Sequence, residues 1–140
     1  HAHPANRHPL WSRGLEMCIR DSPLSEAENV LVENGRILQI RKNISKSLEN
    51  QQVGEFLGLM MLSSEHVKIL LERYSYLKKN HVGAFHNSSS LSNAYITDML
   101  QEIINCGVTV NPVFTEGKWC EIDTPEDLKN AEKSINKFQS

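Results

Sequence analysis

Two carboxylates near the C-terminal end of the chain have the spacing of a metal site. Glu121 and Asp123 stand two residues apart at the end of a short predicted strand, so their side chains point to one side and Ile122 to the other. Mg²⁺ prefers oxygen ligands of this kind together with substrate phosphates. Spacing alone leaves a structural alternative open, in which Glu121 faces solvent and Asp123 helps to cap the following helix.

That helix begins with Thr124-Pro125-Glu126-Asp127, which combines a capping residue, proline at the first helical position and acids in the first turn. We expect Leu128, Ala131 and Ile135 to form its buried side.

Two more helices are predicted upstream. The first follows Ser63-Ser64, either of which can cap it, and its apolar stripe is Val67, Leu70, Leu71 and Tyr74. The second covers about residues 93–106 and ends at Gly107, which suits the left-handed position after a helix. Its apolar stripe is Ile96, Met99, Leu100, Ile103 and Ile104. The polar loop 81–92 between the helices is long enough to suggest a functional role.

Strands are predicted in three regions. Residues 28–33 and 36–41 flank Asn34-Gly35, the preferred pair for a tight hairpin turn, and alternation places Ile37 and Ile40 on opposite faces. Residues 54–62 read as a buried strand, and residues 108–114 as a strand whose Pro112 favours an edge or an end. The order of strands and helices predicts a mixed α/β fold.

The composition excludes several classes of function. The chain has 140 residues, of which 39% are hydrophobic and 23% charged, and its formal charge is −2. This mild acidity gives no support for nucleic-acid binding, and the longest apolar run, residues 56–62, is too short to cross a membrane. Cys18, Cys106 and Cys120 fit neither a disulfide framework nor a zinc site, so a cytoplasmic location is expected.

The first 22 residues differ from the rest. Residues 1–11 are rich in histidine and proline, and residues 12–22, with the core Met17-Cys-Ile-Arg-Asp-Ser22, resemble a translated sequencing adapter. We therefore expect residues 1–22 to be a non-native leader without ordered structure, which makes a metal site at His1, His3 and His8 a poor hypothesis. The alternative is a genuine flexible arm. The domain proper is expected to cover residues 23–137.

Four motifs in order carry a resemblance to a known family: Pro23-Leu-Ser-Glu-Ala-Glu28, Gly54-Glu-Phe-Leu-Gly-Leu59, Ala94-Tyr-Ile-Thr-Asp-Met-Leu-Gln101 and Trp119-Cys-Glu-Ile-Asp-Thr124. With them the chain resembles the C-terminal half of phosphocholine cytidylyltransferases and sugar-1-phosphate nucleotidyltransferases. The resemblance implies a partial nucleotide-diphospho-sugar transferase-like fold with a Rossmann-like mixed sheet, truncated at its N-terminus. It also implies Mg²⁺-dependent transfer of a nucleotidyl group from an NTP, expected to be CTP, to a phosphorylated acceptor, with release of pyrophosphate.

The same resemblance assigns residues. Asp123 matches a metal-binding aspartate, and Glu121 beside it is a second candidate ligand for Mg²⁺ or the acceptor. Glu55, Tyr95, Asp98 and Trp119 are candidate substrate-binding residues, Trp119 for a choline-like head group. Structural alternatives stay open: a rim position for Glu55, a solvated one for Asp98 and core packing for Trp119. Lys42 is expected to be surface charge.

The sequence also departs from the family. It has no Gly-rich phosphate loop with Arg and Lys, and no separate mid-domain aspartate for the metal. The chain alone is therefore expected to be catalytically inactive. Three hypotheses remain: a fragment of an enzyme acting on phosphocholine or a phosphonate, a fragment of a sugar-1-phosphate nucleotidyltransferase, or a non-catalytic interaction module.

Overall fold

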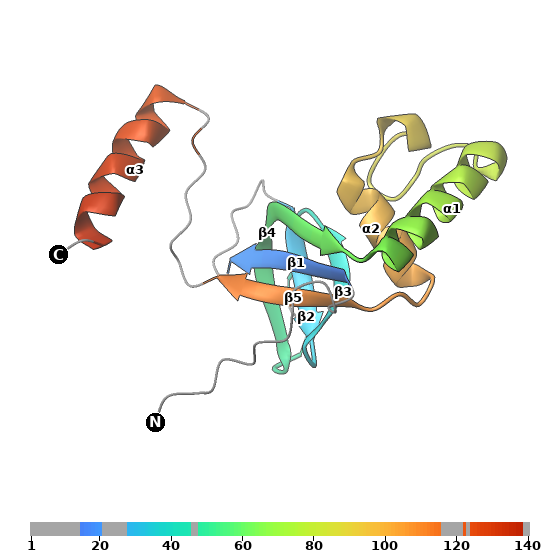
Figure 1. Cartoon of the computed structure of the whole chain (residues 1–140), viewed down its shortest axis with the longest axis horizontal. Coiled ribbons are helices and arrows are strands. Elements are labelled where there is room, and N and C mark those ends of the chain that lie inside the picture. The colour runs from blue at the N-terminus through green and yellow to red at the C-terminus, as the bar shows by residue number, and fades with distance from the viewer. Residues whose placement is uncertain (1–14, 21–27, 46–47, 116–121, 123, 139–140) are drawn as a thin grey trace.

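A strongly twisted five-stranded sheet forms the centre of the computed structural model, which describes residues 15–20, 28–45, 48–115, 122 and 124–138 (Figure 1). The strands are β1 Leu15–Arg20, β2 Asn29–Glu33, β3 Arg36–Arg41, β4 Gln51–Leu62 and β5 Val110–Thr115. The helices are α1 Ser64–Asn80, α2 Ile96–Asn105 and α3 Pro125–Phe138, with a short 3-10 turn, η2, at Leu91–Asn93. The strand order is β3-β2-β4-β1-β5, which confirms the mixed α/β class.

The hairpin of β2 and β3 is confirmed at its turn. Asn34 and Gly35 both have positive φ, 50° and 73°, as a type I′ turn requires. The prediction that Ile37 and Ile40 face opposite ways is wrong, since both are buried, at 3% and 1% exposure. The physical reason is a bulge: the register shifts so that Leu38 has no partner on β2 and is 41% exposed.

β4 is longer than predicted because it serves two neighbours. It pairs with β2 from Gln51 to Glu55 and with β1 from Glu55 onward. Gly58, with φ of 74°, lies where the register of the β1–β4 pair shifts. Beyond it Leu59 and Met60 are 52% and 37% exposed, so the second half of β4 is not the buried strand expected from its apolar sequence.

The structure corrects the expectation that nothing before Pro23 is ordered. Residues Leu15–Arg20 form β1, antiparallel to β4 and parallel to β5. Without β1, one edge of β4 and one edge of β5 would have no partner among the described strands. An extended segment of alternating sequence can pair with both edges. Residues 1–14, 21 and 22 lie outside the described part of the chain, and the foreign origin of the leader remains a hypothesis.

Residues from the sheet and α2 form the main core. Its fully enclosed members are Val30, Val32, Ile37, Ile40, Leu100, Ile103 and Val110. α2 presents the apolar stripe predicted for it, except that Ile96 is 44% exposed. Gly107, with φ of 92°, directly follows the last helical cap residue, as expected.

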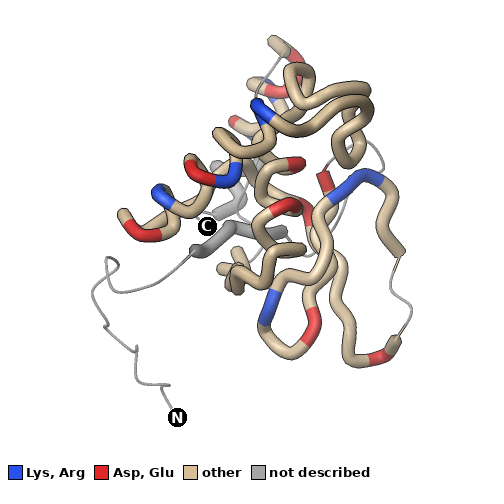
Figure 2. Tube along the Cα trace, turned by 90° about the vertical axis from the view of Figure 1, so that its right-hand side faces the viewer, with Lys and Arg blue, Asp and Glu red and all other residues tan. Residues whose placement is uncertain are grey.

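α1 is less buried than its sequence predicts. Ser63 caps it as expected, its Oγ accepting a hydrogen bond from the amide of His66 at 3.3 Å. Leu77 packs with Phe85 and Met99 in a second, smaller core, but Val67, Leu71 and Tyr74 are 40%, 55% and 39% exposed. In Figure 2 acidic and basic positions are spread over the described chain, and neither kind gathers in one area.

α3 begins as predicted. Thr124 Oγ1 accepts from the amide of Asp127 at 3.2 Å, and the Asp127 carboxylate accepts from the amide of Thr124 at 2.9 Å. Figure 1 shows the helix away from the sheet. Ala131 is buried at 3% exposure, whereas Leu128 is 49% exposed, which corrects its assignment to a buried side.

Candidate functional site

Glu55 lies where β4 passes from β2 to β1. Its Cα pairs with Asn29 of β2 and with Arg20 of β1, so it stands in the middle of the sheet. Glu55 and Asn29 are only 6% and 4% exposed. Burying a carboxylate costs free energy unless it is compensated, and Glu55 keeps its place as a candidate for ligand binding on its position in the sheet. This location replaces the rim position that was its structural alternative.

Glu28 lies one residue before β2 and belongs to the opposite face of the sheet. Its carbonyl accepts a hydrogen bond from the amide of Phe56 at 2.9 Å, which makes Phe56 its neighbour across the strands. Cross-strand neighbours project to the same face and successive residues to opposite faces. Glu28 therefore projects away from the face that carries Glu55 and Asn29.

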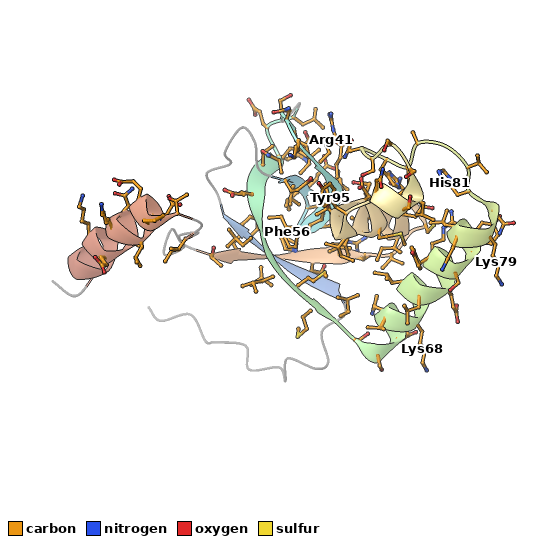
Figure 3. The ribbon with its side chains drawn as sticks, turned by 90° about the horizontal axis from the view of Figure 1, so that it is seen from above. Arg41, Phe56, Lys68, Lys79, His81 and Tyr95 are labelled. Carbon is orange, nitrogen blue, oxygen red and sulfur yellow. The ribbon has the colours of Figure 1, made fainter. Side chains whose placement is uncertain are left out.

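The pKa of Glu28 is raised from its ordinary value of 4.5. Burial is the largest cause, the positive charge of Lys42 acts against it, and the negative charge of Asp98 adds to it. Lys42 and Asp98 thus lie close enough to Glu28 to act on its charge. Figure 3 labels one neighbour of each of these residues: Arg41 beside Lys42, Phe56 across from Glu28 and Tyr95 bonded to Asp98. The three neighbours lie in one part of the molecule, away from Lys68, Lys79 and His81 of the α1 region.

Asp98 is buried at 3% exposure and organises the loop before α2. One carboxylate oxygen accepts from the amide of Asn87 at 3.1 Å, and the other accepts from Ser88 Oγ at 2.8 Å and from the amide of Tyr95 at 3.0 Å. These bonds cap the helix and fix the loop against it. The solvated position considered for Asp98 is therefore wrong, since three donors from the loop surround it.

Glu102, one turn further along α2, ties the same loop to α1. Its Oε1 accepts from Arg73 Nε at 2.8 Å, and its Oε2 lies 2.8 Å from Nε2 of His86. Burial acts to raise the pKa of Glu102, but the bonds from Arg73 and His86 outweigh it, and this pKa lies below its ordinary value of 4.5. Asp98 and Glu102, on the first two turns of α2, thus hold residues 86–88 of the loop by hydrogen bonds.

The site residues predicted from the sequence lie in different parts of the fold where the structure describes them. Glu55 is on one face of the sheet, whereas Asp98 acts on the charge of Glu28, which projects from the other. Tyr95 gives its amide to Asp98, while the residue is 72% exposed. Trp119, Glu121 and Asp123 lie outside the described residues, so the metal site and the choline-binding role stay predictions.

Sequence reasoning missed Glu28 as a candidate, whereas its assignment of Lys42 to the surface is confirmed, since Lys42 is exposed. Glu28 ends the first family-like motif, directly before the hairpin, and this position was the available signal. The influence of Lys42 on Glu28 depends on the end of β3 lying beside the start of β2, which follows from the hairpin register. Glu28 joins the candidate site, and Lys42 is an exposed charge that acts on it.

Two cavities flank α1 away from these carboxylates. One is an open depression of about 440 Å³, and the described residues that line it belong to α1, including Leu71 and Tyr76. The other, of about 260 Å³, lies between Tyr74 and Lys78 of α1 and Ser90 and Ser92 of the loop. Within the described residues no cluster of three or more His, Cys, Asp or Glu side chains is arranged to hold a metal ion. Nor does that part of the chain contain a helix of the length and hydropathy needed to span a membrane.

No family model matches the sequence, and no curated protein matches it. Solved structures do resemble the fold. The inositol-1-phosphate CTP transferase from T. maritima is 21% identical, with a TM-score of 0.54, and the match covers 84% of this chain and 43% of that one. A nucleoside-diphosphate-sugar pyrophosphorylase from Vibrio cholerae is 7% identical, with a TM-score of 0.51, and the match covers 87% of this chain and 47% of that one.

These likenesses establish the fold. The chain spans less than half the length of either protein while most of its own length is matched. Its fold therefore resembles that of a part of each of these two α/β proteins.

Proposed function

We propose that this chain is the acceptor-side half of a nucleotidyltransferase, which moves a nucleotidyl group from an NTP to a phosphorylated acceptor and releases pyrophosphate. The observation that carries the proposal is the fold likeness to two structures described as a CTP transferase and a sugar pyrophosphorylase, over 84% and 87% of this chain. The four family-like motifs support it independently. The nucleotide would be held by the other half, and the whole domain would work in the cytoplasm.

In such a transfer the acceptor phosphate attacks the α-phosphorus in line, and the protein mainly positions groups and neutralises charge. Glu55 and Asn29, buried side by side on one face of the sheet, would orient the acceptor. Asp98 would act indirectly, by fixing the loop that precedes Tyr95. Glu121 and Asp123 offer carboxylate oxygens that suit Mg²⁺, which would supply positive charge at the phosphates.

The first candidate acceptor is phosphocholine or a similar phosphonate. Aromatic side chains such as Tyr95, which is 72% exposed, and Trp119 suit a cationic head group. The second candidate is a polyol or sugar phosphate. It is favoured by the likeness to an inositol-1-phosphate CTP transferase, and Glu55 and Asn29 would then bind hydroxyl groups.

The test uses the uninterrupted protein that contains this sequence. Pyrophosphate release is measured with CTP, Mg²⁺ and, in turn, phosphocholine, 2-aminoethylphosphonate, inositol-1-phosphate and glucose-1-phosphate. We expect one acceptor class to support turnover and Asp123→Asn to lower kcat by at least about 100-fold. The matched control is Glu126→Gln, which changes an exposed carboxylate of α3.

Glu55→Gln is expected to raise KM for the acceptor while KM for CTP stays the same. The present chain alone is expected to release no pyrophosphate. Absence of turnover with all four acceptors and with the other NTPs would overturn the proposal.

A further inference from the structure

β1 occupies a slot one strand wide between β4 and β5. It pairs antiparallel with β4, Leu15 opposite Leu62 and Arg20 opposite Glu55, and parallel with β5 along its whole length, Leu15 opposite Val110. β4 and β5 are not neighbours in the strand order. Among the described elements β1 is therefore what joins β5 to the rest of the sheet by backbone pairing.

The occupant of this slot belongs to the segment for which we hypothesise a foreign origin. Residues 15–20 lie within the segment 12–22 that resembles a translated adapter. If the segment is foreign, as we hypothesise, it was never selected for packing in this fold, yet it forms a strand between two others. Its sequence only alternates Leu15, Met17 and Ile19 with more polar residues, which many strands would do. Backbone hydrogen bonding is thus sufficient to explain how it is held.

We propose that the slot between β4 and β5 accepts an extended segment through its backbone, with little dependence on side-chain identity. In the uninterrupted domain, we infer, a strand of the nucleotide-binding half occupies it; this assignment of the occupant rests on the proposed function. β1 stands in for that strand. The match to less than half of each related structure leaves a large part of the domain to be attached, and this slot is where the sheet needs a strand.

Exposed apolar residues beside the slot support the same occupant. Leu59 and Met60, on the half of β4 that pairs with β1, are 52% and 37% exposed. A single strand in the slot leaves both side chains uncovered, whereas a strand that belongs to a larger layered unit brings further elements over the two faces of the sheet on which they lie.

The pairing defines what the slot accepts. The segment must run antiparallel to β4 and parallel to β5 over about six residues, as β1 does. A strand between two neighbours uses its amides on both sides, so proline is excluded from its interior. At the alternating positions, one hydrophobic residue is expected to replace another, and one polar residue another, with little effect on pairing.

The first experiment changes the side chains of β1 in the full chain and keeps Arg20, which lies opposite Glu55. The variant carries Leu15→Val, Glu16→Thr, Met17→Val, Cys18→Thr and Ile19→Val. We expect its melting temperature to stay within about 5 °C of the parent, roughly the shift that 1 kcal/mol produces in a chain of this size. Loss of the cooperative melt in this variant would overturn the proposal.

The second experiment empties the slot and offers a strand in trans. The full chain with Met17→Pro and Ile19→Pro is mixed with fluorescent ten-residue peptides, and binding is followed by anisotropy. One peptide has the sequence of residues 13–22, one replaces its centre with alternating Val and Thr, and one adds a central proline to the second. The control chain carries Ala2→Pro and Ala5→Pro, which leave residues 15–20 unchanged.

We expect the first two peptides to bind with affinities within about tenfold of each other, the proline peptide at least tenfold more weakly, and the control chain to bind none. Binding of the first peptide alone would show side-chain recognition and overturn the proposal. A proline variant that binds no peptide would also overturn the proposal. If that variant dimerises, the slot is filled by a second copy of the chain, which would overturn the proposal as well. These readouts need no nucleotide or acceptor, so their failure is distinct from a failure of the proposed function.

Discussion

Asp98 of α2 holds Ser88 of the preceding loop by a hydrogen bond of 2.8 Å between Ser88 Oγ and an Asp98 carboxylate oxygen. The same carboxylate accepts the amides of Asn87 and Tyr95. Asp98→Ala would leave these donors without their buried acceptor. We predict that it lowers the free energy of unfolding by about 1–3 kcal/mol, measured by urea denaturation.

The matched control for Asp98 is Glu72→Ala, which removes an exposed carboxylate from α1. Its effect should stay within about 0.5 kcal/mol. Equal effects of the two substitutions would show that the loop contacts of Asp98 contribute nothing to stability.

Glu102 makes the stability of the fold depend on pH. Because its pKa is lowered in the folded chain, its contribution is present above pH 4.5 and is lost as the pH falls through the folded-state pKa. Glu102→Gln should therefore lower the melting temperature at pH 7, and the difference from the parent should shrink below about pH 4.5. A difference that does not change between pH 7 and pH 3 would argue against this account.

The contribution of Glu28 to stability changes with pH in the opposite direction. Its pKa is raised in the folded chain, chiefly by burial, so the ionised form opposes folding above pH 4.5. We predict that Glu28→Gln raises the melting temperature at pH 7 and has little effect near pH 3. Thermal unfolding followed by circular dichroism at both pH values checks this, and a lower melting temperature at pH 7 would refute it.

Two leucines of α1 and α2 provide a matched test of where the core lies. Leu100 is fully buried, whereas Leu71 is 55% exposed. Leu100→Ala should cost about 2–5 kcal/mol of stability, because it opens a cavity in the main core. Leu71→Ala should cost less than about 0.5 kcal/mol in the isolated chain. A large cost at Leu71 would indicate that this face of α1 is covered in solution.

Local signals in the sequence predicted most element boundaries. Asn34-Gly35, Ser63 and Gly107 each act through their own backbone or cap geometry, which does not depend on distant residues. The errors arose where pairing decides the outcome. The bulge opposite β2 that buries both Ile37 and Ile40 depends on the register between two strands, which alternation within one strand does not encode.

The candidate site was only partly predictable for the same reason. Glu55 could be chosen from its motif, but its neighbour Asn29 follows from the pairing of β2 with β4. Asp98 could be chosen from its motif as well, whereas its bonds to the loop depend on how residues 87–95 fold back over α2. The exposure of Val67, Leu71 and Tyr74 is not visible in a helical stripe, because periodicity shows that a helix has an apolar face and not what covers it.

The most direct test of the central claim is to read the source DNA across and upstream of the codon for Pro23. If the chain is the acceptor-side half of a nucleotidyltransferase, the uninterrupted gene should encode a Gly-rich loop with Arg and Lys, followed by a mid-domain aspartate, before this codon. A start codon with its own promoter directly upstream of Pro23 would contradict the account and favour a non-catalytic binding role.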